Sequence, residues 1–533
     1  MDPSARRHRA LIWGASLLIA AALAVYASFL YDWLRGPPPA RPPRAAPEVV
    51  DASLRKARAD FRARYLDCSA HLRLAEALAA AGRPVDAFYV MFWARSFFGD
   101  EAFARSHALV VLYRGRHFLG DAPFDASPAN EARLKEHLGS DPQDPAALDY
   151  LAHIAQSRGR AAEALRLVET GLSGHPDDAG LLAYRAELAA AAGDRRGAVT
   201  AWAKLAAARP GTFAARGALE ELGRLARAPG AGEDSVLGRE ALAELLRARP
   251  EDPLIFATFA MAEWRKGGSA AARALVGETL SKHPGQAGAL MVEGALALED
   301  HDTEKAIRRF TEAWEKDPED LYSAAQLAQL YFKARADAEA ALPYYIALYR
   351  SNPRYDDGVP AEQRIREILD SRREAMLKHV RAEGLGRFFS CDDASLRAEA
   401  AAKAAAFKDP RWIETLAGLL DDDTEIVRHN ADYALFQIGK AVPDAVRVRR
   451  DEWLGAEAPL ARARALNLFA DLEPAATFPL VLKALQDRDP VLRFLVRAMV
   501  LDHYYRGTPE GDRARAEYLA REKDPKVLAL TPR

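Results

Sequence analysis

The residue types that most often carry out catalysis or bind metal ions occur singly in this sequence. The chain has 12 histidines and 2 cysteines, and neither Cys68 nor Cys391 belongs to a CxxC pair. We expect two free thiols, and the alternative is one long-range disulfide in an oxidising compartment. Gly-rich phosphate-binding loops, the HExxH metal pair and the GxSxG nucleophile turn are all absent. The sequence therefore predicts no catalytic site, no metal site and no cofactor.

Three features leave room for other chemistry. The acidic run Asp421–Asp423 has the charge of a cation site, but it lacks the alternating ligands and trailing Glu of a calcium loop. His153 and His429 each stand alone in a helical stretch, which favours a surface or hydrogen-bonded role. The aromatic-rich stretch Phe88–Phe124 is unexplained, and a pocket with converging titratable groups there would indicate an enzyme.

The composition indicates an all-α protein. A chain of 533 residues is too long for one hydrophobic core, so it forms either several domains or a repeat array. Its apolar residues are dominated by alanine, as in Ala398–Ala406, and alanine is the strongest helix former. Strand-like runs are hard to find beyond Leu109–Tyr113. The net charge of -2 carries no sign of the positive field that binds nucleic acid, so we expect no nucleic-acid partner.

A charge-free apolar stretch occupies residues 11–30. A helix of about twenty residues crosses the ~30 Å hydrocarbon layer of a bilayer. Tyr31 and Trp33 follow the stretch, where aromatic rings favour the membrane interface. We therefore predict a single transmembrane helix within a membrane anchor over residues 1–35. A Pro-rich linker and a lead-in helix are expected over residues 36–66.

The numbers of arginines on the two sides of this anchor, which indicate its orientation, are equal. Three arginines precede the apolar stretch and three follow it within about fifteen residues. The first three cluster at the helix edge, which favours an N-terminus inside and a soluble part on the exported, periplasmic side of the inner membrane. A cleavable signal peptide is the alternative, because Val25–Ala27 fits the small-x-small rule. The bulky apolar run Phe29–Leu34 favours retention of the anchor.

Prolines recur at a nearly constant interval through the middle of the chain. They stand at Pro142, Pro176, Pro210, Pro250, Pro284, Pro318 and Pro353, at steps of 34, 34, 40, 34, 34 and 35 residues. A glycine stands seventeen residues before the closing proline in three units, at Gly159, Gly193 and Gly267. An alanine stands twelve residues before it in four units, at Ala164, Ala198, Ala272 and Ala306. A glycine there ends a first helix and an alanine lets the second helix cross it closely. Each unit is therefore predicted to be a helical hairpin.

This pattern resembles the tetratricopeptide repeat (TPR) family. The unit from Pro253 carries Phe256, Ala260, Gly267 and Ala272 at the positions that the family fills with large, small, Gly and Ala residues. The resemblance implies a TPR solenoid over residues 67–354, including a unit that starts at Cys68. It also implies a groove that is lined by first helices and binds a peptide segment or helix of a protein partner. The groove residues that it assigns are Leu254, Met261, Trp264, Arg265, Met291, Leu298, Tyr322, Gln329, Phe332 and Lys333. The alternative for Trp264 and Phe332 is packing between repeats.

The period changes near residue 390. Residues 355–390 are expected to hold a capping helix, Glu362–Val380, and a linker. Over residues 391–533 an acidic turn precedes each of several arginines, in the pairs Asp393 with Arg397, Asp423 with Arg428, Glu457 with Arg462, and Asp489 with Arg493. This pattern is similar to HEAT-type repeats, in which such residues form a ladder between stacked hairpins. The resemblance implies a HEAT-like domain with structural rather than catalytic charges.

These features together predict an interaction protein. The chain is expected to be a scaffold, tethered to the inner membrane of a bacterium, that assembles an envelope complex through its TPR groove. The alternative is an accessory subunit of an exopolysaccharide synthesis or secretion machine. An enzyme built on the irregular units near residues 100–142 is the third possibility. No small-molecule substrate is indicated.

Overall fold

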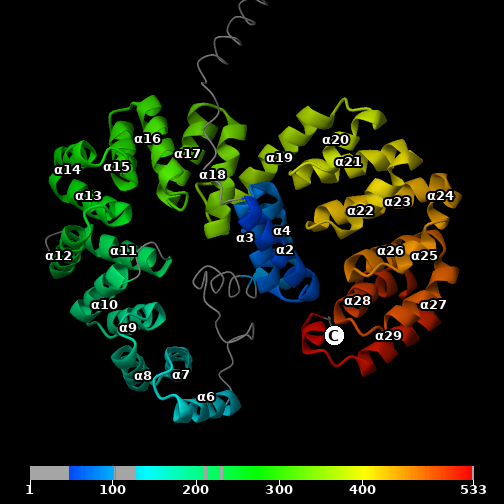
Figure 1. Cartoon of the computed structure of the whole chain (residues 1–533), viewed down its shortest axis with the longest axis horizontal. Coiled ribbons are helices and arrows are strands. Elements are labelled where there is room, and N and C mark those ends of the chain that lie inside the picture. Colours follow the sequence, from blue (N-terminus) through cyan, green and yellow to red (C-terminus); the bar gives the residue numbers. More distant parts are fainter. Residues whose placement is uncertain (1–46, 101–102, 104–127, 209–212, 229–231, 531–533) are drawn as a thin grey trace, which may run out of the picture. The chain divides into compact units, whose positions relative to one another are not determined.

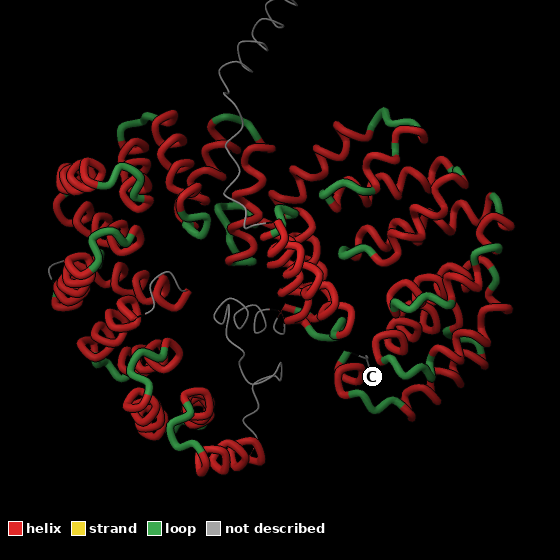
Figure 2. Tube along the Cα trace, viewed as in Figure 1, coloured by secondary structure: helices red, strands yellow, loops and turns green. Residues whose placement is uncertain are grey.

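The computed structural model describes residues 47–100, 103, 128–208, 213–228 and 232–530, which all lie in one compact unit, Arg44–Arg533. Every regular element in these ranges is helical, so the predicted all-α class is confirmed (Figure 2). No helix in the described ranges combines the length and the apolar character needed to cross a bilayer. The predicted anchor over residues 11–30 lies outside them.

The middle of the chain is an array of antiparallel hairpins. Its helices are α6 (Pro128–Ser140), α7 (Pro145–Ser157), α8 (Ala161–Gly174), α9 (Ala179–Ala191), α10 (Arg195–Ala208), α11 (Phe213–Ala226), α12 (Glu233–Ala248), α13 (Pro253–Gly267), α14 (Ser269–Lys282), α15 (Ala287–Glu299), α16 (Thr303–Lys316), α17 (Leu321–Gln329), the π-helical turn η1 (Leu330–Ala334) and α18 (Ala338–Ser351). Each first helix packs on the second helix of its own hairpin, as α9 packs on α10, and from α7 to α13 also on the next first helix, as α9 packs on α11. In Figure 1 the first helices α7, α9, α11, α13 and α15 lie along one side of this array and the second helices along the other.

Glycines end the first helices as the sequence predicts, with one shift. Gly159 and Gly193 adopt the left-handed conformation, at φ 72° and 79°. In the unit that begins at Pro253 this conformation falls on Gly268, one residue after the predicted Gly267. His301 takes the same position in the following unit at φ 59°, although a side chain is strained there. His301 thus replaces the glycine of the repeat pattern, and the turn between the two helices is retained.

The alanines at the helix crossings are buried. Ala164, Ala198, Ala272 and Ala306 are all 0% exposed. A larger side chain at these points would push the two helices of a hairpin apart, because the distance between packed helix axes depends on the side chains at the contact. The predicted hairpin geometry is therefore confirmed.

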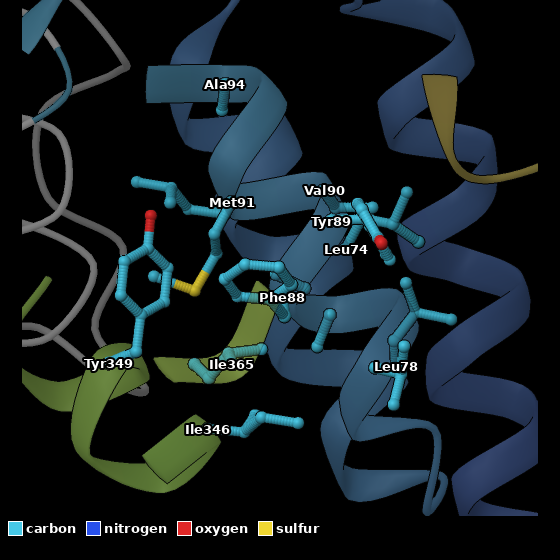
Figure 3. Close-up of a cluster of buried hydrophobic side chains, with 14 of the residues drawn as sticks. Leu74, Leu78, Phe88, Tyr89, Val90, Met91, Ala94, Ile346, Tyr349 and Ile365 are labelled. Carbon is cyan, nitrogen blue, oxygen red and sulfur yellow. The ribbon is translucent and has the colours of Figure 1, made fainter. Parts of the chain in front are cut away.

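The first hairpin of the described chain packs against helices far away in sequence. Helices α2 (Pro47–Ala63), α3 (Cys68–Ala80) and α4 (Pro84–Phe98) pack on one another. Figure 3 shows Phe88 of α4 in one buried cluster with Ile346 and Tyr349 of α18 and with Ile365. The Phe88 and Tyr349 rings meet edge to face at 5.3 Å. The unit expected at the start of the solenoid thus packs on α18, near the other end of the array.

Residues 361–530 continue the stack in a second style. The elements are α19 (Ala361–Leu377), η2 (Ala382–Gly384), α20 (Gly386–Phe389), α21 (Ala394–Phe407), η3 (Pro410–Trp412), α22 (Ile413–Gly418), η4 (Leu419–Asp421), α23 (Glu425–Ala441), α24 (Pro443–Arg447), α25 (Arg450–Leu454), α26 (Pro459–Leu472), α27 (Pro474–Ala484), α28 (Pro490–Leu495), η5 (Val496–Tyr505), α29 (Pro509–Arg521) and α30 (Pro525–Ala529). Helix α19 contacts both α18 and α21, so it continues the stack where a terminal cap was expected. Helices α21, α23 and α26 pack side by side, an arrangement compatible with HEAT-like repeats.

Candidate functional site

The predicted partner-binding residues come from three successive first helices. They are Leu254, Met261, Trp264 and Arg265 on α13, Met291 and Leu298 on α15, Tyr322 and Gln329 on α17, and Phe332 and Lys333 in η1. Helices α7, α9, α11, α13 and α15 contact one another in this order. We call the exposed side chains of these five helices and of α17 the first-helix surface.

Helix α13 presents a cation beside a partly apolar stripe. The helix is started by Asp252, whose carboxylate accepts hydrogen bonds from two backbone N–H groups of its first turn at 3.1 Å. Leu254, Met261 and Arg265 are spaced by seven and four residues, so they lie on one helical face. Arg265 is exposed, whereas Leu254 and Met261 are half-buried. Trp264 packs partly against the main hydrophobic core and keeps part of its ring at the surface.

Helix α15 contributes less surface than its sequence indicates. Met291 is 8% exposed, so its side chain belongs mainly to the core. The cause is the close approach of α15 to α13, where a Cβ added at Gly288 would overlap with the carbonyl oxygen of Pro253. Leu298 remains half-buried at the surface.

The aromatic residues of α17 and η1 differ in exposure. Tyr322 is 38% exposed, with its ring edge-on to Phe310 at 6.1 Å. Phe332 is half-buried against Tyr345, and the Arg364 guanidinium lies 4.6 Å from its ring centre. Tyr322 is therefore the more available aromatic contact, and Phe332 has a packing role as well.

The other two assigned residues lie nearby. Lys333 is exposed and its Nζ lies 3.5 Å from Asp357, and Gln329 is half-buried. A π-helical turn places Phe332 and Lys333 after α17. Such turns rotate the following side chains relative to a regular helix, which the repeat pattern alone does not predict.

The first-helix surface changes character toward α7 and α9. His153 stacks on Tyr184 with ring centres 3.9 Å apart and planes at 7°. Nδ1 of His153 donates to the backbone oxygen of Asp149 at 2.8 Å. Burial raises the pKa of the Asp149 carboxyl to about 6, and burial also raises the pKa of Glu187. This part of the surface is acidic and polar.

A charged cluster where α4 meets α21 was not predicted from the sequence. Asp86 is 0% exposed, and it accepts hydrogen bonds from Ala394 N at 2.7 Å and from Arg397 at 3.1 Å. Arg83 forms a second ion pair with Asp86. Asp86 thus caps a helix that begins 308 residues later in the chain. We call Asp86, Arg83 and Arg397 the junction cluster.

The acidic run singled out in the sequence adjoins the junction cluster. Arg58 of α2 donates three hydrogen bonds to Asp423, the shortest of 2.6 Å, and Arg62 pairs with Asp421 at 2.6 Å. Asp422 binds Arg397 at 3.0 Å. An open cavity of about 480 Å³ lies beside these groups. Arginines engage all three carboxylates, and in the described ranges no cluster of side chains has the composition of a metal site.

The thiols and aromatic residues near this region have structural surroundings. No disulfide joins Cys68 and Cys391, and burial raises the pKa of the Cys391 thiol. Of the stretch Phe88–Phe124, Phe88 is fully buried and Phe97 stacks on Trp93 at 5.8 Å. Residues 104–124 lie outside the described ranges.

The C-terminal arginines form ion pairs between hairpins, but with other carboxylates than the sequence predicted. Arg397 pairs with Asp422, Arg462 with Asp487 at 2.9 Å, and Arg493 with Glu522 at 2.8 Å. In each case the carboxylate follows its arginine by 25 or 29 residues. These ion pairs link successive hairpins, as expected for a ladder.

The carboxylates that precede these arginines have another role. Asp393 and Asp489 accept hydrogen bonds from the first N–H groups of α21 and α28, so each caps its own helix. A short Asp side chain at the N-cap position reaches the N–H groups one turn ahead, which leaves the arginine free for the next repeat. The predicted pairs of Asp393 with Arg397 and Asp489 with Arg493 are therefore corrected.

No family model and no curated protein matches the chain. Similar solved structures include a tetratricopeptide repeat protein from Parabacteroides merdae, at 17% identity and a TM-score of 0.28, covering 45% of this chain and 91% of that one. PilW, a type IV pilus biogenesis factor, is 15% identical with a TM-score of 0.24, covering 42% and 96%. The TPR domain of P58(IPK) is 14% identical with a TM-score of 0.18, covering 73% and 100%.

The resemblance to TPR proteins is confirmed. It rests on the hairpins, glycine turns and buried alanines described above.

Proposed function

We propose that this chain is a scaffold that binds a segment of a partner protein on its first-helix surface. The observation that carries the proposal is the continuity of the first helices from α7 to α15, on which Trp264 is half-buried and Arg265 exposed, with Tyr322 exposed on α17. Aromatic and arginine side chains supply most of the energy in protein interfaces, because they combine large contact area with hydrogen bonding. Stacked helical hairpins offer such a surface without the need for a deep pocket.

A membrane tether is part of the same proposal. The charge-free stretch 11–30 and the flanking aromatic residues support one spanning helix, and the clustered N-terminal arginines support export of the repeat array. The scaffold would then assemble a complex on the outer side of a bacterial inner membrane. Protease treatment of intact and permeabilised spheroplasts tests the orientation. Digestion of the array in intact spheroplasts is expected, and protection there would reverse the assignment.

Partner capture tests the surface. The tagged full chain is purified from detergent-solubilised membranes, and co-purifying proteins are quantified by mass spectrometry. Substitution of Trp264 and Phe332 by Ala is expected to reduce capture of the principal partner by about tenfold or more, because two aromatic contacts are removed. Tyr322→Ser provides a second readout with little effect on packing, since the ring is already 38% exposed.

Matched controls lie on other helices. Leu165 on α8 and Phe407 on α21 are 37% and 43% exposed, and their replacement by Ala removes comparable apolar area away from the first-helix surface. These two variants are expected to retain full capture. If the surface variants and the controls capture every partner equally well, the first-helix surface is not the binding site.

A further inference from the structure

The first-helix surface has an acidic part and a basic part on different helices. Its acidic part lies on α7 and α9. Asp149 is 5% exposed and Glu187 is exposed, one on each helix. In the described ranges neither carboxylate forms an ion pair with Lys or Arg. The rings of His153 and Tyr184 stack on the same two helices, and burial, together with both carboxylates, raises the pKa of Tyr184.

His153 adds a hydrogen-bond acceptor to this part. Its Nδ1 donates to the Asp149 backbone oxygen, which leaves Nε2 as the acceptor of the neutral ring. The histidine side chain is 44% exposed. A cationic donor that approached here would meet a carboxylate, a ring nitrogen and an aromatic face together.

The basic part lies two helices further on. Arg227 directly follows α11, and burial, together with the charge of Arg265 on α13, lowers the pKa of Arg227. The Arg227 guanidinium folds over Gly223, 2.8 Å from the position of an added Cβ, and the methyl group of Thr258 on α13 lies 2.7 Å from that position. Arg227 is therefore directed toward α13.

Neither arginine is neutralised by direct contact. In the part of the chain that the structure describes, no carboxylate lies within ion-pair distance of Arg227 or Arg265. Glu220, seven residues before Arg227, is an acidic group whose charge raises the pKa of Arg227 and so partly opposes the lowering. Two arginines held together without a paired carboxylate repel each other, and an acidic group from outside would relieve this repulsion.

We propose that the first-helix surface binds, in one orientation, a peptide segment whose cationic side chains lie over α7 and α9 and whose carboxylates lie over α11 and α13. This inference rests on the proposed scaffold function and specifies the partner. Neighbouring helix axes lie about 8–10 Å apart, so two helix steps correspond to roughly 16–20 Å. An extended chain covers that distance in about five or six residues. The partner segment therefore carries its basic and acidic groups about six residues apart.

Fluorescence anisotropy with synthetic peptides tests this charge order. The probes are four labelled 12-residue peptides with one apolar centre: two lysines and two glutamates placed six residues apart, the lysines alone, the glutamates alone, and neither. The full chain is used in detergent at low ionic strength. The peptide with both charges is expected to bind about fivefold to tenfold more tightly than either single-charge peptide.

Charge reversal identifies the two parts separately. Arg265→Glu is expected to weaken the glutamate-bearing peptides about tenfold and to leave the lysine peptide unchanged. Glu187→Lys is expected to do the opposite. Arg308 is exposed on the second helix α16, and Arg308→Glu is the matched control with no expected effect. Both target side chains are exposed, so circular dichroism is expected to show unchanged helix content.

The outcomes separate this inference from the scaffold function. Equal effects of both reversals on all peptides, or tight binding of the neutral peptide alone, would overturn the charge order. Absence of binding by every peptide also overturns it. In that case continued loss of partner capture by the Trp264 and Phe332 variant would leave the scaffold function standing.

Discussion

Removal of the Asp86 carboxylate is the sharpest test of how the N-terminal hairpin is held. Asp86 lies on α4, and it is 0% exposed. Its oxygens accept from the first N–H of α21 and from Arg397, and Arg83 pairs with it from its own hairpin. Burial raises the pKa of Asp86 to about 6, against the opposing charges of Arg397 and Arg83. The Asp86→Ala variant removes all of these contacts at one position.

The expected loss of stability depends on which partners Arg397 and the N–H of Ala394 keep in the variant. Arg397 is 4% exposed and keeps Asp422 at 3.0 Å, so it is not left without a counter-charge. Breaking a buried ion pair costs about 3–5 kcal/mol when nothing replaces it, and the remaining partner places this case near the lower value. The N–H of Ala394 also loses its acceptor, at about 1–3 kcal/mol. We expect a total of about 4 kcal/mol, a factor of about a thousand in the opening equilibrium of α21.

Hydrogen exchange measures this opening locally. Amide exchange in α21 is expected to accelerate about a thousandfold in Asp86→Ala, while α13 and α15 are unaffected. Asp392 provides the control, because it is 83% exposed and lies 3.8 Å from Arg83. Asp392→Ala is expected to change stability by less than about 0.5 kcal/mol. Equal exchange of α21 in the two variants, or acceleration below about fivefold, would refute the capping role of Asp86.

Two further predictions concern other parts of the chain. Hydrogen bonds from Arg493 and from backbone N–H groups lower the pKa of Glu522 to about 2, so its stabilising effect is complete above its ordinary pKa of about 4.5 and is lost as the pH falls toward 2. We expect amide hydrogen exchange in α29 to accelerate as the pH falls over that range. The Glu522→Gln variant is expected to show this faster exchange already at neutral pH. An exchange rate in α29 that does not depend on pH would contradict the prediction. Gly288→Ala is expected to destabilise the chain by about 2 kcal/mol or more, because the new Cβ overlaps with the Pro253 carbonyl oxygen. In a thermal melt Gly277→Ala is the control, since nothing lies within 4 Å of its added Cβ, and a slight stabilisation of about 0.5–1 kcal/mol is expected there.

The hairpins could be predicted because their determinants are local. A glycine such as Gly159 and an alanine such as Ala164 act within one unit, so a fixed spacing is sufficient to identify the turn and the helix crossing. Boundaries were less secure where two glycines are adjacent, as at Gly267 and Gly268, since either can adopt the left-handed conformation. The docking of α4 on α18 could not be predicted, because no local pattern states which distant helix receives Phe88.

The candidate site was predictable at the level of helices and less so for single residues. The phase of the repeat places Tyr322 and Arg265 on the surface, and both are exposed. It also places Met291 there, whose burial follows from a contact between two backbones at Gly288 rather than from its own position in the repeat. Arg227 was missed since it lies in a lengthened unit where the repeat phase was lost.

Two kinds of contact hold the N-terminal hairpin on the rest of the stack. The cluster around Phe88 and Tyr349 is apolar and non-directional, so it stabilises the docked state but tolerates small shifts of α4 along α18. The junction cluster contributes less energy, because desolvation offsets much of the attraction within a buried ion pair. Its hydrogen-bond geometry, however, permits only one arrangement of the two helices. A hydrogen bond from Ala394 to Asp86 exists only if α4 meets the first turn of α21 in register. The apolar cluster therefore supplies most of the affinity of this contact, and the junction cluster fixes its register.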